Sequence, residues 1–327
     1  MLTQTASGSR AWRADTIDAP EAWHCPLSEA ALAILDEAVR EWQGRQAVTD
    51  RRPQDRLHEA AAESLDVPRA ALELGRGFTI ITAGQPDRYS PRELQAVYWL
   101  VGQLLGRPQE QNVQGTLLYD VRDTGQDVRY GARFSVTSAE STFHTDNSFG
   151  DEVLDYVGLL CLRPAKSGGE SQLVSGYSVI NELLARHREA LEVLGRPFHV
   201  DRRGGMRPGD EPTARFPVLG GGGDLLVRYL RFWIEAGHDK AGLPLTTEQV
   251  NALNALDRVA NEHRLRVEFT LAAGEMLFVN NRWILHNRTA FEDYPEPERQ
   301  RHYVRLWLQR PQGMSVAPEA GDESAES

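Results

Sequence analysis

The hydrophobic pattern of the first third of the chain predicts two helices with a strand between them. Residues 28–46 carry apolar side chains at helical spacing behind Ser28, a residue type that caps helix N-termini. Residues 90–106 repeat this arrangement, with Ser90 as the cap and Pro91 at the first helical position. The stretch GFTIITAG, residues 77–84, is β-branched and aromatic between glycines, which predicts a strand.

From residue 113 onward the pattern predicts mainly short strands with helices inserted between them. The strands between 113 and 175 are VQGTLLYDVR, STFHTDNSF, DYVGLLCLR and ESQLVS, and further strands run through LRVEFTLAAGEMLFVNNRWILHNRTAF and RQRHYVRLWLQR. Helical spacing returns in residues 177–195 and 246–263. This order predicts a mixed α+β chain dominated by β, with an antiparallel barrel or a double-sheet jelly roll at its core.

Composition and charge narrow the classes of partner. The chain has 327 residues, 41% of them hydrophobic and 25% charged, which is ordinary for a globular protein with a large core. The net charge of -11 argues against nucleic acid and anionic membranes as partners. No apolar run reaches the roughly 18 residues of a membrane span, and no signal peptide is evident, so a cytoplasmic protein is expected. The two cysteines, Cys25 and Cys161, predict neither a disulfide framework nor a thiolate metal site.

The same features predict one domain with two disordered ends. We expect residues 1–12 to be disordered, residues 13–310 to form a single domain, and residues 311–327 to form an acidic, disordered tail. Four of the acidic residues lie in that tail: Glu319, Asp322, Glu323 and Glu326.

The stretch STFHTDNSFGD offers a candidate metal site. On a strand, His144 and Asp146 would project from the same face, because residues i and i+2 do so. The spacing alone is weak evidence, since His199 and Asp201 repeat it. That second pair is followed at once by Arg202 and Arg203, whose charges are unfavourable beside a dication.

A distant histidine and two arginines support the interpretation of His144 and Asp146 as metal ligands. Iron(II) in oxygen-activating enzymes is often held by two histidines and one carboxylate, with open positions left for other ligands. His286 ends an apolar, strand-like run and is the candidate third ligand. Arg301 and Arg305 follow in RQRHYVRLWL, and a guanidinium fork suits bidentate capture of a carboxylate.

These motifs, in this order, resemble the iron(II)/2-oxoglutarate-dependent oxygenases of the taurine dioxygenase superfamily (TauD/TfdA-like, clavaminate synthase-like). The resemblance rests on FHTDNSF, SGGESQLVSG and LHNRTAFEDYPEPERQRHYVRLWL, and it covers residues 113–310. It implies a double-stranded β-helix (jelly-roll) core with flanking helices and helical insertions. It also implies Fe(II) as the cofactor, with 2-oxoglutarate and dioxygen as cosubstrates.

The resemblance assigns roles to individual positions. Arg301 and Ser171 match the residues that bind the far (C5) carboxylate of 2-oxoglutarate, and Arg305 matches a second arginine near the substrate and the C1 end of the cosubstrate. The residues that match the iron ligands, which are also the catalytic set, are His144, Asp146 and His286.

The implied reaction is oxidation, foremost hydroxylation, of an unactivated C–H bond, with conversion of 2-oxoglutarate to succinate and carbon dioxide. The substrate class stays broad: a small organic acid, an amino-acid derivative or a natural-product intermediate. Related halogenases lack the carboxylate that Asp146 supplies, so halogenation is disfavoured, while desaturation or cyclisation stays open. A non-catalytic jelly-roll binding protein and a member that has lost turnover are the alternatives of other classes.

Residues that flank the motifs are the candidates for substrate contact. Arginines among them could hold an acidic substrate; the alternative is an amphipathic strand whose aromatic side chains pack in the core and whose arginines face solvent. A homo-oligomer is neither required nor excluded by the sequence. The candidates are Glu140, Phe149, Arg215, Arg228, Tyr229, Arg231, Trp233 and Arg305.

Overall fold

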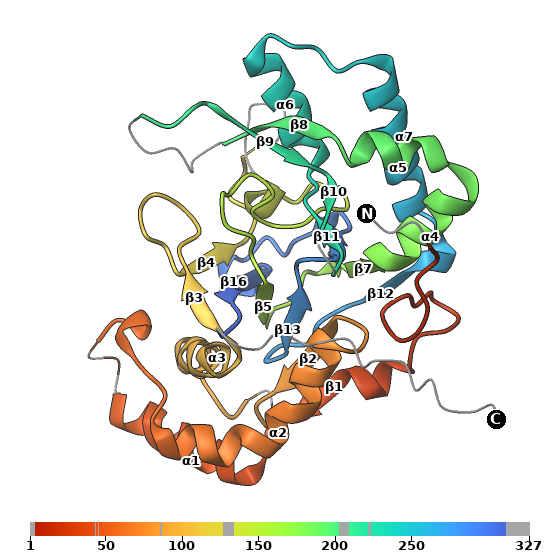
Figure 1. The fold of residues 1–327 in the computed structure, drawn as a ribbon. Coiled ribbons are helices and arrows are strands. Elements are labelled where there is room, and N and C mark those ends of the chain that lie inside the picture. The colour runs from red at the N-terminus through yellow and green to blue at the C-terminus, as the bar shows by residue number, and fades with distance from the viewer. Residues whose placement is uncertain are drawn as a thin grey trace, which may run out of the picture.

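The computed structural model describes residues 4–42, 44, 46–85, 87–126, 134–202, 209–221 and 224–311. It shows a mixed α/β fold with the strands in the centre of the molecule and helices on both sides of them (Figure 1). Residues 312–327, nearly all of the expected acidic tail, lie outside the described residues.

The largest sheet has seven strands in the order β1-β2-β13-β5-β16-β3, with β4 also paired to β16. Its neighbours are antiparallel except for the parallel pair β1 and β2. Its strands are β1 (His24–Pro26), β2 (Phe78–Thr82), β3 (Arg107–Gln109), β4 (Leu118–Val121), β5 (Tyr156–Arg163), β13 (Met276–Asn280) and β16 (His302–Gln309).

The second sheet is antiparallel and has the order β12 (Arg266–Phe269), β7 (Ser171–Ser175) and β14 (Ile284–Arg288). In its register His286 lies opposite Leu173, and Arg288 lies opposite Ser171. The described residues also form three two-stranded sheets: β6 (Ser167–Gly168) with β15 (Phe291–Glu292), β8 (Pro197–Asp201) with β9 (Thr213–Pro217), and β10 (Leu219–Gly220) with β11 (Leu226–Val227).

The large sheet is buried on both faces, and its side chains alternate between two hydrophobic clusters. On β13, Met276 and Phe278 pack with the N-terminal helices, whereas Leu277 and Val279 belong to the other cluster. This is the expected period of two along a strand. Because both faces are covered, the strand sequences read as continuous apolar runs.

The hydrophobic cluster that contains Met276 and Phe278 lies between the large sheet and three helices that cover one of its faces. These helices are α1 (Glu29–Trp42), α2 (Asp55–Glu73) and α3 (Pro91–Leu105). The α3 helix begins as predicted, because Ser90 and Glu93 form a reciprocal capping box and Pro91 follows the cap. It approaches the sheet closely where Gly102 meets the Leu306 side chain, since a Cβ at Gly102 would collide with it.

The remaining helices are α4 (Gly176–Arg186), α5 (Arg188–Leu194), α6 (Arg231–Ala241) and α7 (Thr247–Ala260). The single helix expected over 177–195 is broken at His187, whose φ of -143° and ψ of 45° are not helical. Short 3₁₀ turns are at Pro20–Trp23, Val48–Asp50, Phe134–Val136, His263–Leu265 and Pro297–Arg299.

Two expectations about the fold are wrong. The described chain is not dominated by β, because helices hold more of its residues than strands do. Residues 4–12 are not a disordered end: Trp12 is 3% exposed and its indole N–H donates to the Arg76 carbonyl at 2.8 Å. Ala6 and Asn181 also exchange two hydrogen bonds, both 2.8 Å long. Apolar burial and paired backbone groups therefore hold this segment in place.

No helix within the described residues is long and apolar enough to cross a membrane.

Candidate active site

His144 is held beside His286 by a single antiparallel bridge, not by a strand. Its backbone N–H donates to the His286 carbonyl at 3.0 Å, and the His286 N–H donates back at 2.9 Å. The strand predicted for residues 141–149 is therefore wrong: only this isolated bridge forms, and a turn begins at Asp146. The left-handed φ of 53° at Asn147 marks the point at which the chain leaves the extended conformation.

The residues around this bridge are fixed by buried hydrogen bonds. The Thr145 hydroxyl donates to the Val227 carbonyl at 3.1 Å and accepts from the Tyr229 N–H at 3.0 Å, so Thr145 faces away from the two histidines. Asn281 accepts from the Asp146 N–H at 2.8 Å and donates to the Asp146 carbonyl at 2.9 Å. These hydrogen bonds fix the direction of the His144 and Asp146 side chains although the segment is not a strand.

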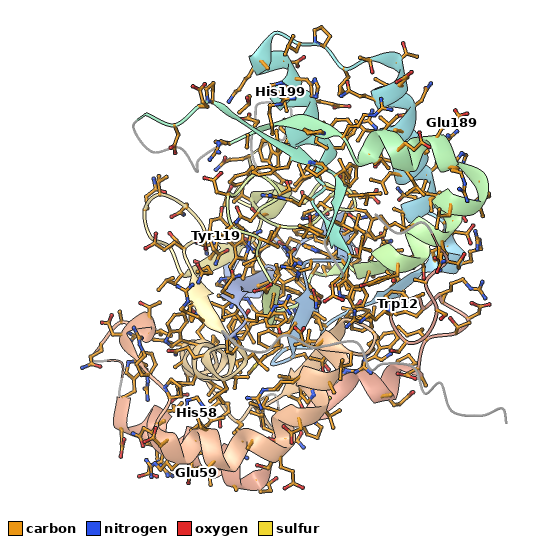
Figure 2. The ribbon with its side chains drawn as sticks, in the orientation of Figure 1. Trp12, His58, Glu59, Tyr119, Glu189 and His199 are labelled. Carbon is orange, nitrogen blue, oxygen red and sulfur yellow. The ribbon has the colours of Figure 1, made fainter. Side chains whose placement is uncertain are left out.

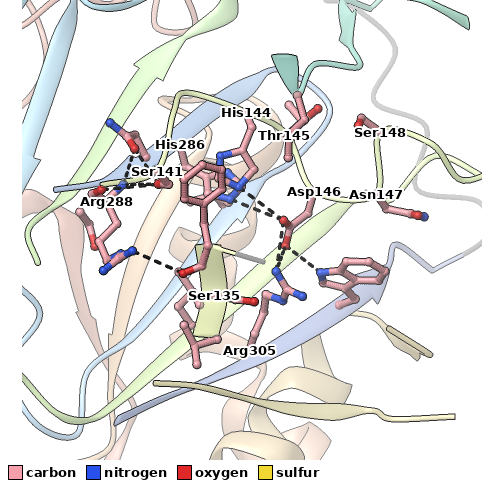
Figure 3. Close-up of a pocket in the computed structure, with 18 of the residues that line it drawn as sticks. Ser135, Ser141, His144, Thr145, Asp146, Asn147, Ser148, His286, Arg288 and Arg305 are labelled. Atoms are coloured by element: carbon pink, nitrogen blue, oxygen red, sulfur yellow. Dashed lines mark hydrogen bonds and ion pairs between the residues drawn. The ribbon is translucent and has the colours of Figure 1, made fainter. Parts of the chain in front are cut away.

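Three potential ligand atoms converge at this point (Figure 3). The Nε2 atoms of His144 and His286 lie 3.6 and 4.0 Å from Oδ1 of Asp146, and the two imidazole centroids are 4.3 Å apart. All three ligand atoms lie within 4.8 Å of one another. The imidazole Nδ1 of His144 lies 2.7 Å from the Thr142 carbonyl, so it carries the proton and leaves the Nε2 lone pair free.

The Asp146 carboxylate is buried but well supported. Its Oδ2 accepts from the Trp307 indole N–H at 2.8 Å, and the Arg305 guanidinium lies 3.0 Å from it. Burial alone would raise the pKa of Asp146, but Arg305 and the two histidines together hold that pKa below its usual range. Burial first, and then the neighbouring His144, lowers the pKa of His286 to about 3. The site therefore presents a carboxylate and a neutral imidazole.

A cavity between the two larger sheets opens onto these atoms. Leu159, Leu277 and Trp307 come from the large sheet, and Ser171 and Leu173 come from the second sheet. The cavity also takes in Arg301, which comes just before β16, and Arg305, which projects from the same face of β16 as Trp307 because the two are two residues apart. The other residues that line it are Val121, Phe134, Ser135, Ser141, Thr145, Asn147, Ser148, Phe149, Leu230, Phe232, Trp233, Val279, Asn287 and Arg288.

Comparison with known proteins identifies the family from this sequence and site. The family model "Taurine catabolism dioxygenase TauD, TfdA family" matches residues 36–307. The chain belongs to this family. It is accordingly a 2-oxoglutarate-dependent dioxygenase with non-haem iron as its cofactor, and the expected enzyme class is confirmed.

Individual TauD, TfdA relatives are similar over much of the chain. An FR-33289 synthase from Streptomyces rubellomurinus is 27% identical over 94% of this chain and 91% of its own length. A uridine-5'-phosphate dioxygenase from Amycolatopsis sp. is 30% identical over 59% of this chain and 68% of its own length. The fold matches a solved asparagine oxygenase in complex with Fe(II), a hydroxyasparagine and succinate. That match has a TM-score of 0.64 and 21% identity, and it covers 88% of this chain and 93% of the other.

Some of the residues predicted from this family pattern lie in the cavity and others do not. Ser171, Arg301, Arg305, Phe149 and Trp233 line it. The Arg301 side chain is 4% exposed, and its guanidinium lies 3.8 Å from the centre of the Tyr303 ring. Arg305 is engaged with Asp146 and also donates to Gln111 at 2.8 Å.

Three predicted substrate residues are placed elsewhere. Glu140 and Arg215 are exposed and do not line the cavity. Arg231 begins α6, where it pairs with Glu235 at 2.6 Å and Asp257 at 3.0 Å, and it does not line the cavity either. Because none of the three lines the cavity, substrate contact by these residues stays a prediction. The amphipathic strand offered as the alternative for this segment does not form over residues 231–235, because α6 begins at Arg231.

Neighbouring candidates outside the cavity have structural contacts. Tyr229 is fully buried and its hydroxyl donates to Asp257 at 2.5 Å. The Arg228 guanidinium lies 3.5 Å from the centre of the Phe216 ring and donates to the Gly150 carbonyl.

Sequence reasoning missed several groups that line the cavity. Arg288 is two positions beyond His286 on β14, so the rule for residues i and i+2 would have found it. Trp307 is two positions beyond Arg305 on β16 and could have been found in the same way. Ser148 is 4% exposed, and its hydroxyl has no hydrogen-bond partner among the described residues. No sequence signal distinguished it from other turn serines.

The competing His199 and Asp201 lie on β8, and neither lines the cavity. Figure 2 shows where His199 lies in the fold. Asp201 is fully buried and pairs with Lys240 at 2.7 Å. His199 Nδ1 lies 3.2 Å from the Thr213 hydroxyl, and no third metal-ligating side chain joins the pair among the described residues.

Proposed function

We propose that this enzyme hydroxylates a C–H bond of a small molecule held in the cavity, with iron(II) bound by His144, Asp146 and His286. The convergence of these three side chains in the cavity lining, with their ligand atoms all within 4.8 Å of one another, carries the proposal. We also propose that the seven-stranded and three-stranded sheets form the two halves of a double-stranded β-helix core.

The donor set fits an iron(II) ion. Two imidazole nitrogens and one carboxylate match the facial triad of non-haem iron oxygenases, which leaves positions for other ligands. Histidine ligands usually donate their second ring nitrogen to a neighbour, as His144 does to Thr142. The Nδ1 of His286 has no partner among the described residues, so this imidazole depends on its backbone bridge for orientation.

Arg301 and Ser171 supply the proposed subsite for the far carboxylate of 2-oxoglutarate. The Arg301 guanidinium is buried in the cavity, and a guanidinium fork binds a carboxylate strongly where water is excluded. Arg305 and Trp307 hold Asp146 in place, and in this arrangement Arg305 is a positioning residue. A direct contact of Arg305 with substrate or with the C1 end of 2-oxoglutarate remains a prediction.

The apolar wall of the cavity supplies the proposed substrate side. Phe149 follows the Asp146 turn, and Leu230, Phe232 and Trp233 come from the start of α6. Side chains of this kind exclude water and orient a small molecule by shape. Bound iron and 2-oxoglutarate supply the oxidising chemistry, with dioxygen consumed and with succinate and carbon dioxide formed. The relatives' names, which include a uridine-5'-phosphate dioxygenase, support a small-molecule substrate.

An anaerobic titration tests the proposal. Addition of Fe(II) and 2-oxoglutarate to the protein without oxygen should produce a weak visible metal-to-ligand charge-transfer band. Folded protein that binds iron but gives no band would overturn the cofactor assignment. A screen for compounds that accelerate succinate formation, followed by mass spectrometry of the product, then distinguishes a gain of one oxygen from a loss of two hydrogens.

A further inference from the structure

Two guanidinium groups line the cavity without a carboxylate partner. Arg301 is 4% exposed, and Arg288 projects from β14 into the same cavity. Neither forms an ion pair within the part of the chain that the structure describes, whereas the third arginine of the cavity, Arg305, is paired with Asp146. Buried charges are normally paired, so this end of the cavity is electrostatically incomplete.

Unsatisfied donor atoms occur on both side chains. Arg288 Nη1 and Arg301 Nε are buried and have no hydrogen-bond partner among the described residues. Both guanidinium groups lie against Phe291, at 4.7 and 5.1 Å from the ring centre, which places them near each other. Buried donors without partners are uncommon in folded proteins and indicate a ligand or bound water.

The strand register shows which ligand group fits. Arg288 lies opposite Ser171, and His286 lies opposite Leu173, so the cavity face of this sheet presents a proposed iron ligand followed by an arginine–serine pair. Two residues along a strand span roughly 7 Å. That is the scale of a short diacid with one end at His286 and the other end at Arg288.

We propose that Arg288 is a second cation for the far carboxylate of 2-oxoglutarate, beside Arg301 and Ser171, and that it links cosubstrate binding to the cavity wall at residues 134–139. This inference rests on the proposed function of the same cavity and adds a residue to it.

Arg288 is linked to the wall through its second terminal nitrogen, Nη2. Its Nη2 donates to the Phe134 carbonyl at 3.5 Å and to the Ala139 carbonyl, and Figure 3 shows the guanidinium directed toward the backbone beside Ser135. Phe134 and Ser135 are themselves part of the cavity lining. The planar guanidinium of Arg288 thus binds the wall through Nη2 and has Nη1 available for the carboxylate. A carboxylate bound at Nη1 would therefore also restrain the backbone of the wall that Nη2 binds.

Binding measurements on the iron-loaded protein without oxygen test Arg288. We expect R288Q to weaken 2-oxoglutarate binding roughly tenfold to hundredfold, as for loss of one charge-assisted hydrogen bond. Binding of 2-oxopentanoate, which has a methyl group in place of the far carboxylate, should not change. R288K, which keeps the charge, should lie between R288Q and wild type.

The matched control is R76Q. Arg76 is also a buried guanidinium that stacks on an aromatic ring, Phe78, and donates to a backbone carbonyl, that of Ala22, but it lies outside the cavity. The R76Q substitution should leave the affinities for both 2-oxo acids unchanged. Equal weakening of both acids by R288Q would show a structural role and overturn the proposal, as would unchanged 2-oxoglutarate binding. A loss confined to an anionic substrate would assign Arg288 to the substrate instead.

Hydrogen exchange gives a readout independent of turnover. Binding of 2-oxoglutarate should slow exchange of backbone amides in residues 134–141 in wild type and much less in R288Q. Slowing of equal size in both proteins would overturn the link to the wall. If wild-type protein itself shows no charge-transfer band, the proposed function fails; if the band is present and R288Q behaves as wild type, only the Arg288 inference fails.

Discussion

The chain contains two His-x-Asp pairs, and only one of them lies in the cavity. His199 and Asp201 sit on a regular strand, β8, which is the geometry that the spacing was expected to require. His144 and Asp146 sit on an isolated bridge followed by a turn. The difference lies in the neighbours. Asp201 is paired with Lys240, whereas Asp146 faces two imidazoles and a cavity.

The middle residues of the two pairs show the same contrast. Thr145 is bonded on its far side to Val227 and Tyr229, which turns the two flanking side chains toward the cavity. Val200 is simply packed in the hydrophobic core. The spacing of a motif therefore identifies candidates, while the partners of each side chain decide between a metal site and a structural pair.

Removal of one histidine from each pair should give the largest difference. H144A should lower 2-oxoglutarate-dependent turnover by at least about 100-fold, because loss of a ligand costs more than loss of its supporting partner. H199A should leave turnover per folded molecule unchanged. Succinate formation and iron content, measured on both variants, check this; comparable losses in the two would contradict the assignment.

The residues that bond to each pair should differ in their effect on iron affinity. W307F removes the indole donor to Asp146 and should weaken iron affinity roughly 10–100-fold. T213V removes the hydroxyl next to His199 and should leave iron affinity unaltered. Iron titration against a competing chelator measures both, and an unaltered W307F would show that Asp146 needs no support from Trp307.

Removal of the Asp201 charge should change the stability of the protein and not its turnover. D201N breaks the ion pair of a fully buried carboxylate with Lys240 and should lower the free energy of unfolding by about 2–4 kcal/mol. Lys240 is partly exposed, so the cost stays below that of a fully buried pair. Urea unfolding gives the value. A D201N protein of wild-type stability but impaired turnover would reverse our interpretation.

The smallest expected effect is at the middle residue of the active pair. T145V removes two buried hydrogen bonds and should cost about 1–2 kcal/mol in unfolding free energy, with a detectable loss of iron affinity as His144 and Asp146 shift. T145S keeps the hydroxyl and is the control. Equal behaviour of the valine and serine variants would mean that methyl packing, not hydrogen bonding, sets the direction of the pair.

The fold could be predicted where local signals are strong. The Ser90 cap with Pro91 fixed the start of α3, and the strands β5, β13 and β16 followed from long apolar runs. The helix α2 was missed, and Pro68 within it is a residue that normally indicates a break. The start of α6 contains aromatic and β-branched residues that favour strands, so the alternative offered for residues 227–235 is a strand, whereas tertiary packing makes residues 231–235 helical.

The candidate site was predictable in its residue types but not in its outer parts. His286 and Arg301 were candidates from their residue types and neighbours, and Ser171 from the family resemblance; the structure places all three at the cavity. Glu140 and Arg215 were chosen by nearness in sequence, which carries little information about direction. Arg288 was overlooked, although the strand rule that failed at His144 applies without change at His286.

The packed N-terminal segment bears on the order in which the molecule folds. Ser175 and Ser178 donate to the carbonyls of Arg10 and Trp12, so this segment is bonded to residues made more than 160 positions later. Contacts of such sequence separation form late, because a long loop must close first. On the ribosome this segment leaves the exit tunnel early, yet it can dock only after α4 has emerged and packed. Residues 10–12 are thus among the last of the described residues to reach their place.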